Sequence, residues 1–83
     1  MEEFYFTFGV QYRTNPHPSV VDGVRPDPDG WWTIVAPDED AARAKMNELV
    51  GERWAFCYQA SLDSFGKLDY YPKGEMLRIK LPE

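Results

Sequence analysis

The sequence lacks the residues that most covalent and metal-dependent frameworks require. Cys57 is the single cysteine, so no disulfide can form within the chain, and we expect a reducing environment. His17 is the single histidine and stands in no recognisable catalytic signature. We therefore predict that the protein is not an enzyme and that it has no catalytic, cofactor-binding or metal-binding residues.

Long apolar runs are also missing. No segment approaches the roughly 18 to 20 apolar residues that span a bilayer. The chain opens with Met1-Glu2-Glu3, opposite in sign to the start of a secretory signal. We expect neither export nor membrane insertion, and a cytoplasmic location.

Basic residues are outnumbered by acidic ones. The net charge is −5 at pH 7, which works against non-specific binding to phosphate backbones. The charge is uneven, because residues 1–52 carry ten acids and four bases, whereas residues 53–83 carry four acids and five bases. This distribution predicts an acidic face and a weakly basic one.

Aromatic residues, in contrast, are abundant. Phe, Trp and Tyr form 16% of the 83 residues and 43% of the chain is hydrophobic, which is typical of a globular protein that buries large rings in a small core. The length predicts a single domain over residues 1–83, with room for one sheet and one helix.

Alternation and caps predict five elements. Apolar residues recur at every second position from Phe4 to Tyr12, which indicates a strand with one face on the core. Residues 31–35 form a second strand that ends before Pro37. Asp38 as N-cap and Gly51 after the last turn delimit an amphipathic helix, whose buried stripe is Ala42, Met46, Leu49 and Val50.

Two further strands, at residues 54–59 and 76–81, follow the helix. Short connections on both sides of the helix predict a right-handed crossover between the second and third strands, with the first strand between them and antiparallel to both. We therefore expect an α+β two-layer sandwich, in which one helix packs on one face of a four-stranded mixed sheet.

Residues 14–30 form a long loop rich in Pro, Gly and Asp, the first place to look for a binding determinant. Its His17 is flanked by prolines, and we interpret it as a turn residue. The alternative is a general base, or a metal ligand together with Asp22, Asp27 and Asp29.

Two aromatic pairs are candidates for contact with a protein partner. Trp31 and Trp32 point to opposite faces of a strand, so one ring should fill the core. The other is either partly exposed, and then a candidate partner contact, or covered by the neighbouring loop. Tyr70 and Tyr71 lie in a polar loop in the less acidic half. Together with His17, these four residues form the predicted partner-binding set.

A nucleic-acid role is the main alternative. Tyr70 and Tyr71 with Lys73, Arg78 and Lys80 mix rings and positive charge, as single-stranded nucleic-acid binders do. The excess of one base over residues 53–83 argues against it. The inverse hypothesis, an acidic mimic of nucleic acid, would require a denser array of carboxylates than −5 over the chain provides.

Five segments carry a resemblance to a known group: residues 6–10, 15–18, 30–38, 53–58 and 71–75. Together they resemble short, largely uncharacterised proteins encoded by bacteriophages of actinobacteria, including mycobacteriophages. The resemblance implies a small phage accessory protein that binds a host protein in the bacterial cytoplasm and alters its activity, as a monomer or a homodimer. It carries over no catalytic residue.

Overall fold

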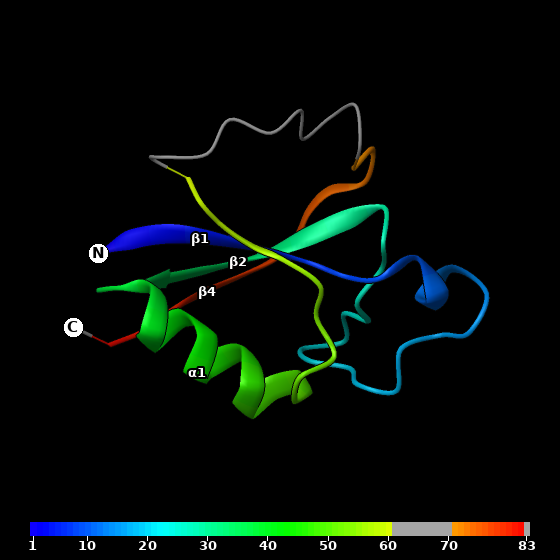
Figure 1. Cartoon of the computed structure of the whole chain (residues 1–83), viewed down its shortest axis with the longest axis horizontal. Coiled ribbons are helices and arrows are strands. Elements are labelled where there is room, and N and C mark those ends of the chain that lie inside the picture. Colours follow the sequence, from blue (N-terminus) through cyan, green and yellow to red (C-terminus); the bar gives the residue numbers. More distant parts are fainter. Residues whose placement is uncertain (61–70, 83) are drawn as a thin grey trace.

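The computed structural model describes residues 1–60 and 71–82. Figure 1 shows a sheet with one helix lying across one of its faces. In chain order the elements are β1 (Glu2–Thr7), the 3-10 helix η1 (Val10–Arg13), β2 (Gly30–Ala36), α1 (Glu39–Val50), β3 (Cys57–Gln59) and β4 (Gly74–Lys80).

The strands form one mixed sheet in the order β3-β1-β2-β4. β1 is antiparallel to both β2 and β3, whereas β4 runs parallel to β2. The predicted α+β class is confirmed, as is the place of the first strand between the second and third.

The core lies between α1 and the sheet. β1 and β2 pair so that Phe4 faces Ile34 and Phe6 faces Trp32, and these four side chains are fully buried. The helix contributes Ala42, Met46 and Val50 to the same cluster. Alternation along the strands and the apolar stripe of the helix therefore meet as the sequence predicts.

The caps of α1 are the predicted ones. The Asp38 carboxylate accepts a hydrogen bond of 2.8 Å from the N–H of Ala41. Gly51 follows the last turn with φ of 66°, a conformation that glycine adopts without the strain of a side chain. Local chemistry thus fixes both ends of the helix.

The opposite face of the sheet is buried as well. Tyr5 packs edge-on against Trp31 with ring centroids 5.7 Å apart, and the Trp31 indole N–H donates to the Thr33 hydroxyl at 3.2 Å. Tyr5, Trp31 and Thr33, which are 9%, 7% and 0% exposed, form a second buried layer on the face away from α1.

The first strand is shorter than its alternation indicates. β1 ends at Thr7, opposite Trp31, because β2 begins at Gly30 and offers no partner further along. Beyond this point the chain turns into η1, and Val10 is 72% exposed. The alternating pattern over residues 8–12 therefore does not form a strand.

Candidate functional site

A β-bulge where the chain enters β3 shapes the surface of this protein. Thr7 pairs with two successive residues, since its N–H donates to the Phe56 carbonyl at 3.0 Å and its carbonyl accepts from the Ala55 N–H at 2.8 Å. Two residues opposite one is the definition of a bulge. The bulge interrupts the strand predicted over residues 54–59, so that only Cys57–Gln59 forms β3.

The bulge separates two aromatic side chains that alternation would place on one face. Trp54 turns towards α1 and packs edge-on against Phe6, with centroids 4.9 Å apart. Phe56 turns outward, and 62% of it is exposed. A large exposed ring beside a bulge is the main surface feature of the described residues.

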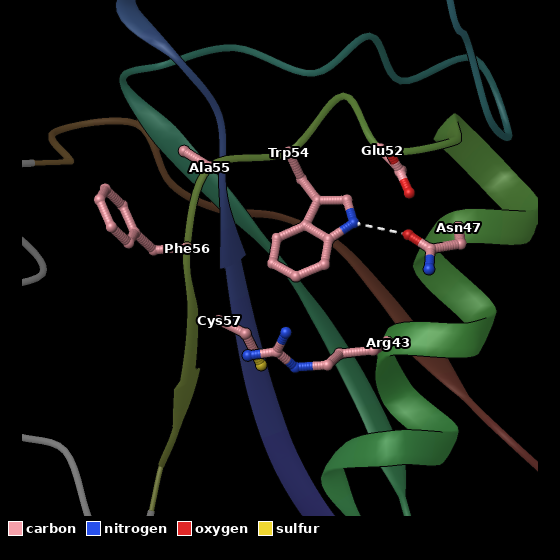
Figure 2. A pocket seen from close by; sticks show the side chains of 7 residues that line it. All are labelled: Arg43, Asn47, Glu52, Trp54, Ala55, Phe56 and Cys57. Atoms are coloured by element: carbon pink, nitrogen blue, oxygen red, sulfur yellow. Dashed lines mark hydrogen bonds between the residues drawn. The ribbon is translucent and has the colours of Figure 1, made fainter.

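A groove runs between α1 and β3 (Figure 2). The Trp54 indole forms its floor and donates a 3.0 Å hydrogen bond to Asn47 Oδ1. Arg43 extends from α1 towards β3, and its guanidinium carbon lies 5.3 Å from the Trp54 ring centroid. The groove has a volume of about 430 Å³ and is lined by Arg43, Asn47, Glu52, Trp54, Ala55, Phe56 and Cys57.

A second cavity lies at the end of β1. Its volume is about 470 Å³, and Phe56 and Ala55 line it as they line the groove. Thr7 also lines it, and the Thr7 hydroxyl is buried without a hydrogen-bond partner among the described residues. The other lining residues are Phe8, Gly9, Val10, Gln11, Arg13, Pro28 and Tyr71.

His17 is fully buried and holds the loop in place. Its Nδ1 accepts from the Ser19 N–H at 3.0 Å, so Nε2 carries the proton and donates to the Arg53 carbonyl at 3.0 Å. Burial is the main reason why the pKa of His17 lies below 6.5. Both ring nitrogens are therefore bonded to backbone groups. His17 has no exposed surface with which to make the predicted contact with a partner.

Neither Trp31 nor Trp32, both members of the predicted partner-binding set, has an exposed ring. Trp32 is fully buried and packs edge-on against Phe8 at 5.3 Å, while Trp31 is 7% exposed. Both faces of β2 are covered, so of the two alternatives for the second ring the partly exposed one is wrong and the covered one holds. Trp32 packs in the cluster that includes α1, and Trp31 packs against Tyr5 on the other face, so neighbours on both faces bury the two rings.

Of the tyrosine pair, Tyr70 lies outside the described residues. Tyr71 is half-buried, and its ring meets that of Trp31 edge-on with centroids 6.4 Å apart. Because Tyr71 lines the second cavity, it is the member of the predicted set that borders a candidate site.

Charged residues of the described segments are largely paired. Lys73 bonds to Asp27 at 2.7 Å, and Arg78 bonds to Glu3 at 2.8 Å and to Glu75 at 3.3 Å. Two of the three cations invoked for nucleic-acid binding thus have carboxylate partners.

Within residues 1–60 and 71–82, no three His, Cys, Asp or Glu side chains come together as a metal site would need. Over the same ranges, no helix has the length and apolar character needed to cross a bilayer.

Phe56 is the residue that sequence reasoning missed. Its place in an alternating run with Trp54 and Tyr58 predicts a strand residue packed on the sheet, and the bulge depends on pairing with Thr7, 49 positions earlier. The available signal was the small residue Ala55 between two large rings, which alone does not indicate a bulge.

Comparison of the chain with protein-family models, with curated proteins and with solved structures gave no match.

Proposed function

We propose that this protein is a non-catalytic binding protein that docks onto a protein partner through the surface centred on Phe56. The observation that carries the proposal is the exposure of 62% of a phenylalanine ring between two cavities. Burying such a ring in a partner would remove apolar area from water, which is the dominant favourable term in protein association.

The residues around Phe56 suit such a contact. Trp54 and Arg43 line the groove on one side, and Tyr71 and Arg13 line the cavity on the other. Trp, Tyr and Arg are the residue types enriched at interface hot spots, where they surround an apolar anchor. The surface thus combines an exposed anchor with the side chains that most often contribute binding energy.

The resemblance to actinobacteriophage proteins supplies a partner class. On this basis we infer that the chain is a phage accessory protein and that the partner is a host protein of the bacterial cytoplasm, whose activity changes on binding.

A pull-down from actinobacterial lysate tests the proposal. The bait is the tagged chain, compared with Phe56→Ser and with Val20→Ser, which removes a different exposed apolar side chain, 49% exposed and outside both cavities. We expect one stoichiometric protein with the wild type and Val20→Ser, unaffected by nuclease, and its loss with Phe56→Ser.

Other outcomes would contradict the proposal. Equal capture by Phe56→Ser would remove this surface from consideration. Capture that nuclease abolishes would favour the nucleic-acid alternative. If the purified wild type is a dimer in solution and Phe56→Ser is a monomer, the surface binds a second copy of the same protein.

A further inference from the structure

β4 forms one edge of the sheet, and its outer side is open. β2 pairs with its inner side, and no strand among the described residues lies beyond it. The Leu81 N–H donates to the Val35 carbonyl at 2.9 Å, so the alternation of a strand points the backbone groups of Arg78 and Lys80 away from β2. An open edge of this kind is a template for pairing with another strand.

The apolar side chains of β4 are only partly covered. Leu77 and Ile79 lie beside Trp32 and Ile34 of β2. The two β2 side chains are fully buried, whereas the two β4 side chains are half-buried, as is Leu81 further along the same face. The helix packs chiefly on β2, so the core is closed over the inner strands and remains open along β4. A further strand beside β4 would remove this apolar row from water.

The other face of β4 carries positive charge at its open end. Arg78 and Lys80 are exposed and alternate with the apolar row. Arg78 forms ion pairs with Glu3 and Glu75, whereas Lys80 has no carboxylate partner among the described residues. A strand added beside β4 would therefore meet an unpaired ammonium group on this face, and a carboxylate next to it would stabilise the pairing.

A second copy of the chain would fit this edge poorly. An antiparallel pair of β4 strands keeps equivalent residues on one face of the joined sheet, so Arg78 and Lys80 of both copies would gather there. Like charges on neighbouring strands destabilise a sheet. A bulge at Met76, the extra residue between Glu75 and Leu77 in the pairing with β2, also interrupts the first part of the strand. The charge of the edge thus favours a different, acidic chain.

We propose that the β4 edge binds an extended acidic segment of a protein, which adds a strand to the sheet. The backbone of the segment bonds to the outer groups of Arg78 and Lys80. Its apolar side chains cover Leu77, Ile79 and Leu81, and a carboxylate on its other face meets Lys80. Addition of a strand to an exposed edge is a recurring mode of peptide recognition. β3 and β4 are opposite edges of the sheet, so this site is separate from the docking surface proposed beside β3.

Amide hydrogen exchange followed by NMR tests the backbone part of the proposal. In the isolated chain the N–H groups of Arg78 and Lys80 should exchange faster than those of Ile79 and Leu81, which point towards β2. The probe is the acetylated and amidated peptide TVEVEVT, which alternates apolar and acidic side chains. At millimolar concentration it should slow the exchange of the Arg78 and Lys80 amides, which contact between side chains alone would not do.

A second peptide and two variants test the charge preference. The basic peptide TVKVKVT should bind more weakly than TVEVEVT. Lys80→Glu should weaken binding of TVEVEVT by about fivefold, because an attraction between neighbouring strands becomes a repulsion, and should reverse the preference between the peptides. Lys45→Glu is the matched control, since it makes the same change of charge on α1 and should keep the preference of the wild type.

The proposal fails if TVEVEVT leaves the exchange of these amides unchanged, or if TVKVKVT binds as tightly. It also fails if the Lys80 N–H is already protected in the isolated chain: in a monomer the chain itself would cover the edge, and in a dimer a second copy would. Phe56→Ser leaves β4 intact and should bind TVEVEVT as the wild type does, so failure of this edge and failure of the docking surface are distinguishable.

Discussion

The imidazole of His17 joins two segments that lie 36 positions apart, through a hydrogen bond of 3.0 Å between Nε2 and the Arg53 carbonyl. The bond ties the long loop to the connection between α1 and β3. Since Nδ1 accepts from Ser19, the arrangement requires the neutral ring with its proton on Nε2.

Stability should therefore fall as the pH drops below 6.5. Burial lowers the pKa of His17 from 6.5, the hydrogen bond to Arg53 opposes this shift, and the charges of Arg53 and Arg25 add to it. Above 6.5 the ring is neutral in both states; below 6.5 the unfolded chain binds the proton first, and stability is lost until the folded pKa is reached. Urea unfolding at a series of pH values measures this loss.

His17→Gln is the control for the pH effect. This variant should be less stable than the wild type at neutral pH and should lack the part of the slope that begins at 6.5. Nitrogen NMR of the ring should show a proton on Nε2. A folded-state pKa at or above 6.5 would contradict the prediction.

Trp54 should contribute to stability as well as to the groove. Trp54→Ala removes the edge-on contact with Phe6 and the bond to Asn47, and we expect a loss of about 2 to 3 kcal/mol in the free energy of unfolding because the ring is half-buried. Trp54→Phe keeps a ring and should cost about 1 kcal/mol. Denaturation followed by circular dichroism measures both, and equal losses would contradict a role for the ring contact.

Gly30 permits the close approach of β2 and β4. A Cβ at this position would lie 2.8 Å from the Gly74 carbonyl oxygen and 2.7 Å from side-chain atoms of Met76. The Met76 side chain can move but the carbonyl belongs to the ladder, so Gly30→Ala should cost about 1 to 3 kcal/mol. Met76→Ala in the same chain should not restore stability. If Met76→Ala fully restores the melting temperature of Gly30→Ala, the clash is with the Met76 side chain and not with the Gly74 carbonyl.

Asp38 should stabilise α1 through its cap. Asp38→Ala leaves the Ala41 N–H without its 2.8 Å acceptor, and we expect a loss of about 1 kcal/mol in unfolding free energy. Asp38→Asn offers an amide oxygen in the same place and should retain most of the stability. If Asp38→Asn is as unstable as Asp38→Ala, the negative charge of Asp38 stabilises the helix and the capping hydrogen bond does not.

Features encoded within a few neighbouring residues were predicted from the sequence. Asp38 and Gly51 mark the ends of the helix by local hydrogen bonding, and the alternation around Phe4 and Phe6 places both rings in the core. The place of β1 between β2 and β3 followed from the lengths of the connections, whereas the pairing of β4 with β2 was not predicted.

Features that depend on distant residues were not predictable. The end of β1 is set by where β2 begins, the burial of His17 depends on Arg53, and the exposure of Phe56 depends on the bulge opposite Thr7. Because the candidate site is built from the last of these, the sequence located neither Phe56 nor the unpaired hydroxyl.

The position of β1 in the middle of the sheet has a consequence for folding during synthesis. Its neighbours are residues 30–36 on one side and 57–59 on the other, so the first strand to leave the ribosome is the one that must wait for both partners. Such non-local pairing favours late, cooperative folding. Until α1 has also been synthesised, the Phe4, Phe6 and Phe8 rings lack the helix that covers them, and it is in this interval that the protein is most exposed to aggregation and to chaperones.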